Sequence, residues 1–479
     1  MPASAHYRGE TAFASLGPEF ADPVAPARFP RHVLRRRNQA WAEAVGLGDL
    51  SDTEWEAHFA RFEPLPDTMP EPLAMRYHGH QFRVYNPDIG DGRGFLFAQL
   101  RDSAGRLLDL GTKGSGQTPY SRSGDGRLTL KGGVREVLAA EMLEALGVYT
   151  SKALSLYETG EALSRNDEPS PARSSVLVRL SHSHIRFGTF QRLAFLDRPD
   201  LIRVLIDHCV EHYYPGLAHR EGEERAAALL ASVVEASARL AASWMSAGFV
   251  HGVLNTDNLT ITGESFDYGP WRFLPASQPD FTAAYFDQSG LYCFARQPEA
   301  VSWALLQLAG ALSLVCEPPK LEQALARFGP AYQEALRERM FARLNLVEGG
   351  FEADMQFLQS LFGWMTETQI GWDQLFHDWH SGAASAVRAA HSIEAKRYAA
   401  PAFKPIREGL EARTGAGMEE FLAQDYFQRP HPVSMLIEEV EAIWASIAEH
   451  DDWGPFEAKL QDIQAMRSAL GVACHRSVM

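Results

Sequence analysis

The stretch His251-Gly-Val-Leu-Asn-Thr-Asp-Asn258, followed by Phe266-Asp-Tyr-Gly269, is the most informative part of this sequence. A turn between short strands that brings an amide and a carboxylate together is suited to hold Mg²⁺ against phosphate oxygens, because a hard cation prefers oxygen ligands. Asn258 and Asp267 are therefore the candidate metal ligands. Each short motif alone is compatible with an ordinary turn, whereas the two in this order, after a helix-like stretch, favour a metal site.

The same residues follow the spacing H-x-D-x-x-x-x-N and D-x-G of protein kinases and aminoglycoside-phosphotransferase-like enzymes. His251 and Asn258 stand at that spacing, and Asp267 opens the D-x-G. One position differs, because Val253 stands where a kinase keeps its catalytic aspartate. A valine cannot orient a hydroxyl nucleophile or take its proton. The metal ligands are thus retained while the usual base is lost, and Asp257 offers a carboxylate at an unusual position.

Length and composition indicate a globular protein. A chain of 479 residues suffices for two or more domains, or for one two-lobed domain with additions, and its 46% apolar and 22% charged residues are ordinary. A net charge of -16 argues against a general nucleic-acid binder. We recognise no signal peptide and no run long enough to span a bilayer. The cysteines lie far apart without a C-x-x-C, which fits a reducing compartment; they are Cys209, Cys293, Cys316 and Cys474. We expect a cytoplasmic protein with no nucleic-acid or membrane partner.

The first 75 residues are predicted to form an extension. We expect a helix from Pro30 to Val45, an acidic helix that contains Trp55, and a Pro-rich link over 64–72. His78 and His80 follow, and because no third ligand is nearby, a structural or hydrogen-bonding role is favoured over metal binding.

Two glycine-flanked acidic turns, Gly90-Asp-Gly-Arg93 and Gly124-Asp-Gly-Arg127, are candidates for phosphate binding. Glycines beside a strand, here predicted over 94–100, let backbone N–H groups approach a polyphosphate without a Cβ in the way. Arg93 adds charge-assisted donors. A plain hairpin turn explains either tetrapeptide equally well.

Lys113 follows a strand predicted over 107–111, and kinase-like folds pair such a lysine with a glutamate on the next helix. The helix predicted over 133–146 has an apolar stripe and ends at Gly147, and Glu136 in its first turn is the natural partner for Lys113. Competing carboxylates, expected on the solvated face of this helix, are Glu141 and Glu144.

Strands are also predicted over 153–157 and 174–180. Arg179 lies within the second, and an arginine in an apolar strand is costly unless it has an anionic partner. Arg179, and Arg186 shortly after it, are each either part of a structural ion pair or a phosphate clamp. From residue 199 the pattern is helical, with long helices expected over 225–248 and 300–316.

Several of these motifs, taken in order, resemble the selenoprotein O family over about residues 25 to 315. The resemblance implies a protein-kinase-like fold in which ATP lies flipped relative to a kinase. It also implies transfer of AMP from ATP to Ser, Thr or Tyr hydroxyls of proteins, with release of pyrophosphate. The motifs that carry the resemblance are Gly90-Asp-Gly-Arg93, Lys113-Gly-Ser-Gly-Gln-Thr-Pro-Tyr-Ser-Arg122, Asp125-Gly-Arg127, Arg135-Glu136, Ser183-His-Ile-Arg-Phe-Gly188, His251 to Asn258 and Asp267-Tyr-Gly-Pro270.

The resemblance also implies site residues by position. Glu136 would pair with Lys113 beside the nucleotide, Asn258 and Asp267 would hold Mg²⁺ or Mn²⁺ against it, and Asp257 would accept the proton. A reversed nucleotide presents its α-phosphate to the nucleophile, which would account for Val253. The residues implied to bind ATP directly are Gly90, Gly92, Arg93, Lys113, Asp125, Gly126, Arg179 and Arg186.

The sequence departs from the family pattern at three places. Arg83 stands where the family usually has glycine, and 284–287 reads Ala-Tyr-Phe-Asp where the family tends to carry Cys-Asn-His-Ser-Asp. Cys474 lies five positions before the C-terminus, and the usual partner cysteine is missing. We therefore expect oxidation to leave activity largely unchanged.

The predicted fold class is α+β: a protein-kinase-like two-lobed fold with an N-terminal extension and a helical C-terminal region. The expected parts are the extension (1–75), an N-lobe (76–182), a C-lobe with the catalytic loop and metal site (183–345), and helices (346–479). The predicted function is a Mg²⁺-dependent protein adenylyltransferase. The alternatives are a kinase that transfers the γ-phosphate, disfavoured by Val253, and an inactive ATP-binding pseudokinase scaffold, disfavoured by the joint retention of Lys113, Glu136, Asn258 and Asp267.

Overall fold

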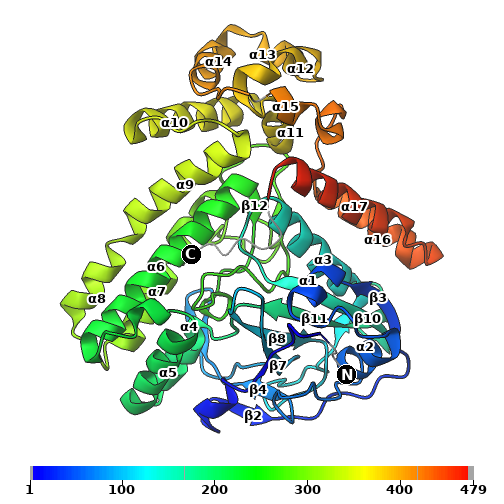
Figure 1. Ribbon diagram of the computed structural model, residues 1–479, viewed down its shortest axis with the longest axis vertical. Helices are drawn as coiled ribbons and strands as arrows, with labels where there is room; N and C mark the ends of the chain where they lie inside the picture. Colours follow the sequence, from blue (N-terminus) through cyan, green and yellow to red (C-terminus); the bar gives the residue numbers. More distant parts are fainter. Residues whose placement is uncertain (1–3, 167, 418, 473–479) are drawn as a thin grey trace.

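An antiparallel sheet organises the first 181 residues (Figure 1). The computed structural model describes residues 4–166, 168–417 and 419–472. The strands of the sheet are β1 (Gly9–Glu10), β2 (Ala21–Pro23), β3 (Val33–Arg37), β4 (Leu73–Met75), β7 (Leu96–Arg101), β8 (Leu107–Lys113), β9 (Leu128–Thr129), β10 (Lys152–Leu163) and β11 (Ala172–Ser181). Their order is β2-β4-β7-β8-β11-β10-β3, with β1 added to β7 and β9 added to β11. Strands from the first 75 residues thus belong to the same sheet as the later ones.

The strands predicted over 94–100, 107–111, 153–157 and 174–180 are confirmed as β7, β8, β10 and β11. In β11, Val176 and Val178 pack into one hydrophobic cluster, whereas Leu177 packs into another on the opposite face. Arg179 pairs with Gly111 of β8 in the ladder, and Leu177 pairs with Lys113. Successive side chains of a strand point to opposite faces, so both faces of the sheet are buried here. Burial of both faces explains why the strand is apolar almost throughout.

The helix predicted from Pro30 to Val45 is wrong over its first half. Residues 33–37 form β3, which pairs with β10, and only α1 (Gln39–Ala44) is helical. Contacts with a distant strand account for this, because Arg35 donates to Glu158 on β10. The helix starts only after Asn38, whose side chain caps it by accepting from the Trp41 N–H. The helix with Trp55 is confirmed as α2 (Asp52–Phe59), and it covers one face of the sheet together with α1.

The opposite face is covered by α3 (Leu130–Ala145), the helix predicted over 133–146. Glu136 is buried on it, in contact with Lys113. The expected solvated position of Glu144 is wrong, because this carboxylate is buried and pairs with Lys152 and Arg467. Those partners come from β10 and from the C-terminal region, which no helical periodicity could reveal.

A helical layer follows the sheet in the chain (Figure 1). Its central helix is α6, which confirms the helix expected over 225–248, and Gly248 follows its last turn in the left-handed conformation (φ 65°). By length and composition α6 is long and apolar enough to cross a membrane, but 61% of its most apolar window is buried by neighbouring helices. Core packing therefore accounts for its apolar character. The helices are α4 (Phe187–Phe195), α5 (Pro199–His212), α6 (Gly222–Ala247), α7 (Gln297–Leu312), α8 (Pro318–Leu325) and α9 (Phe328–Leu344).

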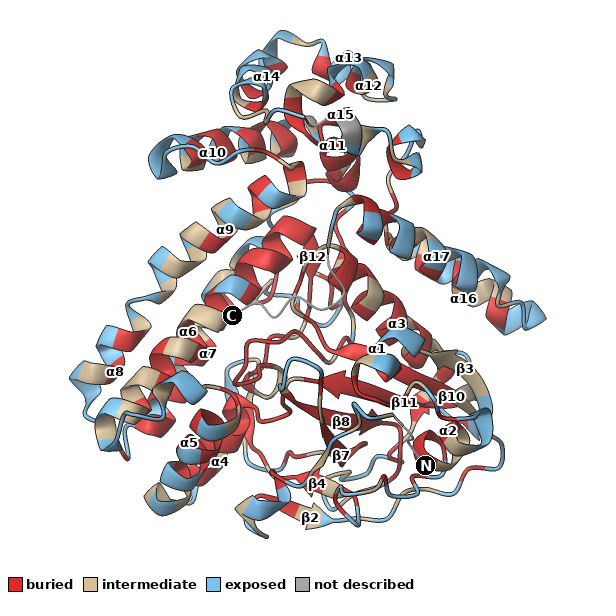
Figure 2. Ribbon diagram, viewed as in Figure 1, coloured by how far each residue is buried: buried red, intermediate tan, exposed pale blue. Residues whose placement is uncertain are grey.

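The last third is helical, as predicted, and part of it returns to the sheet. Its helices are α10 (Phe351–Thr368), α11 (Trp372–Asp378), α12 (Ala386–His391), α13 (Ala395–Tyr398), α14 (Lys404–Glu411), α15 (Glu419–Leu422), α16 (Ile437–His450) and α17 (Gly454–Ala469). Helices α16 and α17 pack on α3, and the guanidinium of Arg35 lies 4.5 Å from the ring centroid of Trp453 (Figure 1). Figure 2 shows buried residues concentrated in the sheet, in α3 and in the C-terminal part of α6.

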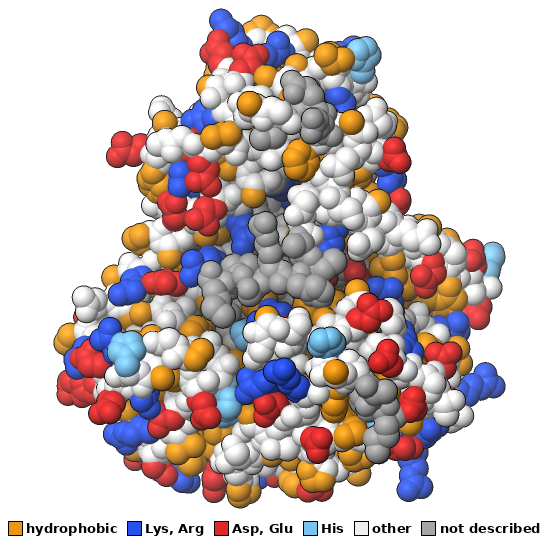
Figure 3. All heavy atoms as spheres, viewed as in Figure 1, with side chains coloured by type: hydrophobic (Ala, Val, Ile, Leu, Met, Phe, Trp, Pro, Cys, Tyr) orange, Lys and Arg blue, Asp and Glu red, His pale blue; other side chains and the backbone are white. Residues whose placement is uncertain are grey.

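The architecture is thus a mixed α+β fold with an antiparallel sheet and a helical C-terminal region, which confirms the predicted class at that level. On the face shown in Figure 3, acidic and basic side chains are interspersed, so the net charge of -16 is not gathered there in one patch. The three cysteines that the structure describes are free and buried; Cys474 lies outside the described residues.

Candidate active site

The loop that carries the candidate catalytic residues begins directly after α6. Strand β12 (Phe249–Val250) pairs with β13 (Arg272–Phe273), which brings 251–258 beside 266–267. The buried ring of His251 holds the two segments together, because its Nε2 lies 3.0 Å from the carbonyl oxygen of Phe266. Burial lowers the pKa of His251, so the ring is neutral and donates this hydrogen bond. His251 therefore has a positioning role.

A cavity of about 660 Å³ lies between this loop and the sheet. Ten of the predicted site residues line it: Gly90, Gly92, Arg93, Lys113, Asp125, Gly126, Arg179, Arg186, Asp257 and Asp267. Glu136 and Asn258 do not line it; Glu136 contacts the lining residue Lys113, and Asn258 directly follows the lining residue Asp257. Segments that are separated by up to 177 positions in the sequence thus meet around one space.

Lys113 joins two carboxylates at the end of the cavity. It pairs with Glu136 of α3, as predicted, and its Nζ lies 2.6 Å from Asp267 Oδ1. Arg179 also reaches Asp267 Oδ1, at 3.3 Å. Burial opposes the charge of Asp267, yet Lys113, Arg179 and Arg93 hold its pKa well below the usual range. Asp267 is therefore ionised, and its φ of 64° shows a left-handed backbone that few non-glycine residues adopt.

Arg186 lies in the same cavity and pairs with Asp91 of the first glycine turn, at 3.0 Å. Its guanidinium also lies 4.2 Å from the ring centroid of Tyr77. Arg179 and Arg186 therefore each have a carboxylate partner, as a structural ion pair requires, and each also lines the cavity, as a phosphate clamp requires. The two readings of these arginines are compatible with one another.

Asp257 differs from the other carboxylates of the cavity because no cation pairs with it within the described residues. Its Oδ1 is buried and has no hydrogen-bond partner there. Burial raises its pKa to about 6, although Arg186 favours the ionised form. Beside it, the side-chain nitrogen of Asn258 donates to the Val253 carbonyl oxygen at 3.0 Å, which leaves the amide oxygen as the possible metal ligand.

Packing accounts for the glycines of the two turns. A Cβ on Gly90 would lie 2.5 Å from the ring of Tyr120, and Gly126 has a φ of 69° with no room for a Cβ beside Gly116. Asp125, predicted to bind the nucleotide, pairs with Arg165 at 2.7 Å and its exposed side chain lies on the cavity wall.

Sequence reasoning missed part of the cavity wall. Arg122, Arg127 and Arg165 line it, together with the 120–124 loop. The first two stand in motifs quoted above, whereas Arg165 lies in a polar connection that has no distinctive pattern. In all, seven cationic side chains and four carboxylates of the described residues line the cavity, an excess of positive charge in an acidic protein. Such a site favours a polyanionic ligand.

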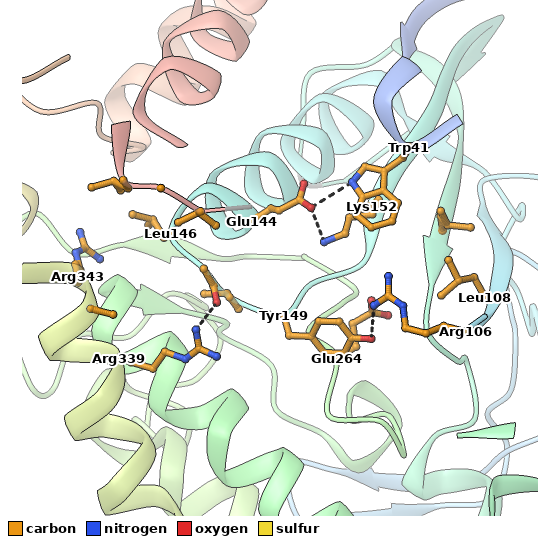
Figure 4. Close-up of a pocket in the computed structure, with 17 residues that line it drawn as sticks. Trp41, Arg106, Leu108, Glu144, Leu146, Tyr149, Lys152, Glu264, Arg339 and Arg343 are labelled. Atoms are coloured by element: carbon orange, nitrogen blue, oxygen red, sulfur yellow. Dashed lines mark hydrogen bonds and ion pairs between the residues drawn. The ribbon is translucent and has the colours of Figure 1, made fainter. Parts of the chain in front are cut away.

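A second cavity, of about 230 Å³, lies elsewhere and contains none of the predicted site residues (Figure 4). Several of its charged side chains already have partners: Glu144 pairs with Lys152, and Arg339 donates to the carbonyl oxygen of Gly147. It is therefore not the predicted nucleotide site.

In the described part of the chain, protein side chains alone do not form a metal cage. Over residues 4–166, 168–417 and 419–472, no group of three or more His, Cys, Asp and Glu residues is placed to hold an ion. His78 and His80 instead make hydrogen bonds, with the Tyr85 hydroxyl at 2.8 Å and the Gln191 side chain at 2.8 Å, as favoured from the sequence.

Comparison with known proteins places this arrangement in a family. The family described as protein adenylyltransferase SelO matches residues 4–464. The chain belongs to the SelO family. It is 44% identical over 475 residues to the protein nucleotidyltransferase YdiU of Synechococcus elongatus, with 94% of each chain covered. It is 47% identical over 457 residues to the YdiU protein of Gloeobacter violaceus, with 93% of each chain covered.

The SelO match corrects the extent of the resemblance found by motif. That resemblance covered about 25–315, whereas the SelO family match continues through the helical region to residue 464. The last third of the chain is therefore part of the SelO architecture. Short motifs missed it because packing helices show an apolar pattern that many helical proteins share, with few distinctive residue strings.

Proposed function

We propose that this SelO-family enzyme transfers AMP from ATP to Ser, Thr or Tyr hydroxyls of acceptor proteins and releases pyrophosphate. The observation that carries the proposal is the joint position of Asp257 and the cationic residues around one cavity. Among the described residues no cation pairs with the Asp257 carboxylate, and the position of a kinase base is taken by Val253. A base that lies four positions later in the chain than the kinase base suits a nucleotide that presents its α-phosphate, rather than its γ-phosphate, to the acceptor hydroxyl.

Lys113, Arg179 and Arg186 are proposed to bind the β- and γ-phosphates. In the structure Lys113 and Arg179 both pair with Asp267, and Arg186 pairs with Asp91. These ion pairs hold the cations in place before ATP binds. Guanidinium groups form paired, charge-assisted hydrogen bonds with phosphate oxygens. Because more cations than carboxylates line the cavity, the arginines can bind phosphate while some ion pairs with carboxylates remain. The glycine turn at 90–92 would cover the same phosphates.

The reaction then follows from the chemistry of the α-phosphate. The acceptor oxygen forms a bond to the α-phosphorus, the bond from that phosphorus to the α,β-bridging oxygen breaks, and pyrophosphate leaves with the electron pair. The hydroxyl proton passes to Asp257. A carboxylate with a pKa of about 6 is largely ionised at neutral pH and is still a stronger base than an exposed aspartate.

Asn258 and Asp267 fit a divalent cation, and we propose that they hold Mg²⁺ or Mn²⁺ together with phosphate oxygens. The pKa of Asp267 is strongly lowered, so this side chain is ionised and offers an anionic ligand. The described residues form hydrogen bonds with its Oδ1 only. The Asn258 amide is oriented by its bond to Val253. When bound, the cation would offset the negative charge that develops on the phosphates.

The kinase-like, two-lobed arrangement belongs to the same proposal. The later strands of the sheet, β7 to β11, correspond with α3 to an N-lobe (76–182), and the 1–75 extension adds β1 to β4 to the same sheet. The α4–α9 layer corresponds to a C-lobe (183–345), and 346–479 to the helical region. The Lys113–Glu136 pair and the cavity between sheet and helices support this division. A cytoplasmic location is proposed because the described cysteines are free.

Two labels of ATP test the function. With an α-phosphate label, acceptor protein should gain label and an AMP mass, and with a γ-phosphate label the radioactivity should appear in pyrophosphate. Lys113→Ala should weaken both ATP binding and transfer, because it removes a phosphate ligand. Transfer of the γ-label alone would identify a kinase. ATP binding without transfer of either label would identify a scaffold.

A further inference from the structure

A hairpin lies against the loop that carries Asp257. It consists of β5 (Gly79–Gln81) and β6 (Val84–Asn86). Gln81 lines the same cavity as Asp257, and the Phe82 N–H donates to Asn255 Oδ1 at 3.0 Å. The tip of the hairpin is therefore fixed relative to the proposed base and stands at the edge of the cavity.

The turn of this hairpin is built from residues that rarely adopt its conformation. Phe82 and Arg83 have φ values of 50° and 64°, where asparagine and glycine are usual. The turn places the ring of Phe82 5.0 Å from Tyr292 and 5.8 Å from Phe286, measured between ring centroids. Arg83 is anchored by Glu299 at 2.9 Å.

Two aromatic side chains extend this contact into solvent. The ring centroid of Tyr285 lies 5.1 Å from that of Phe286, and the two side chains are 83% and 48% exposed. Tyr285 is the most exposed large hydrophobic residue that the structure describes. The segment is held from behind by Asp287, whose carboxylate accepts from the backbone N–H groups of Leu291 and Tyr292.

These contacts form one continuous surface, which we call the aromatic rim: Phe82, Tyr285 and Phe286. It begins at Asn255, to which both the Phe82 N–H and the Tyr292 hydroxyl donate, and Asn255 is two positions from Asp257. Exposed apolar surface that adjoins a reaction site is costly in water and typically marks a binding surface.

We infer that the aromatic rim binds the acceptor protein through a large apolar side chain next to the hydroxyl that receives AMP. The inference rests on the proposed function. An acceptor hydroxyl must reach Asp257, and each neighbouring residue of an extended segment adds about 3.4 Å, so the segment can run from the cavity past Gln81 to the rim. An aliphatic or aromatic side chain there would bury surface against Tyr285 and Phe286. An aspartate would lose hydration, and Arg83 in the hairpin turn is already paired with Glu299.

The test compares two acceptor peptides that differ only in the residue after the serine, leucine in one and aspartate in the other. Transfer of AMP from α-labelled ATP is measured as kcat/KM for each peptide. The wild-type enzyme should prefer the leucine peptide at least tenfold. Tyr285→Ser/Phe286→Ser should reduce this ratio to within about twofold of unity and leave the KM for ATP unchanged.

The matched control is Val387→Ser/Ile393→Ser, which removes two side chains that are 74% and 68% exposed on the C-terminal helical region. It should keep the wild-type ratio. If the double rim variant does not fold, Tyr285→Ser alone is measured in the same way, since so exposed a side chain contributes little to the core.

The outcomes distinguish a failure of the proposed AMP transfer from a failure of the aromatic rim as a binding surface. No transfer of the α-label by the wild-type enzyme to any protein or peptide would overturn the proposed function and the rim with it. Transfer without a preference for leucine, or a preference that survives both rim variants, would overturn the rim alone. Loss of the preference in the control would also count against it.

Discussion

Replacing Asp257 by asparagine should remove catalysis and leave ATP binding intact. The substitution keeps the shape of the side chain but abolishes its basicity, so AMP transfer should fall by about 10²- to 10⁴-fold, the range that a general base contributes. Binding of ATP should be unchanged or tighter, because one negative charge beside the triphosphate is lost. Below about pH 6 the wild-type rate should also fall, since Asp257 is then protonated.

The same substitution has an effect on stability that can be worked out from the structure. Burial raises the pKa of Asp257 from its ordinary 3.8 to about 6. The folded state thus holds the proton more tightly than the unfolded state, and the wild-type enzyme loses stability as pH rises from about 4 to about 6. Asparagine has no such dependence. The difference in unfolding free energy, variant minus wild type, should grow by about 2 kcal/mol between pH 4 and pH 7.

Denaturant titrations at both pH values, with transfer of α-labelled AMP measured at pH 7.5, check the two effects together. Glu141→Gln is a matched control, since it also exchanges a carboxylate for an amide outside the cavity. A variant of Asp257 that retains transfer within about threefold would refute its role as base. A stability difference that does not change with pH would refute the desolvation of its carboxylate.

Four further outcomes are expected. Asp267→Asn should reduce transfer about 10³-fold, because the charge that holds Mg²⁺ is lost, and a Mg²⁺ titration that restores the wild-type rate would contradict this. Glu136→Gln should lower the unfolding free energy by about 3 kcal/mol in a denaturant titration, because Lys113 loses a buried partner. Gly126→Ala should lower the melting temperature and the affinity for ATP, whereas Gly310→Ala, with open space around its position, should do neither. Oxidation with diamide should leave activity unchanged, since the cysteines that the structure describes are buried; a disulfide that includes Cys474 and alters activity would contradict this.

Much of the fold follows from local pattern. The alternation of apolar residues located the strands with Lys113 and Arg179, and an apolar stripe ended by Gly147 located α3. The beginning of the chain was harder, because the basic segment at 33–37 is a strand only through its pairing with β10 and the bond of Arg35 to Glu158. Neither partner is near in sequence, so no local pattern could specify it.

The order of residues establishes which groups are present: an amide and a carboxylate at motif spacing, a lysine with a glutamate on the next predicted helix, and a valine in place of a base. How these groups meet depends on tertiary contacts. These contacts place Asp267 between Lys113 and Arg179, bring Arg165 to the cavity wall, and pair no cation of the described residues with Asp257. The physical reason is that a pKa and an ion pair depend on burial and on distances of a few ångströms, which are set by contacts between segments far apart in the chain.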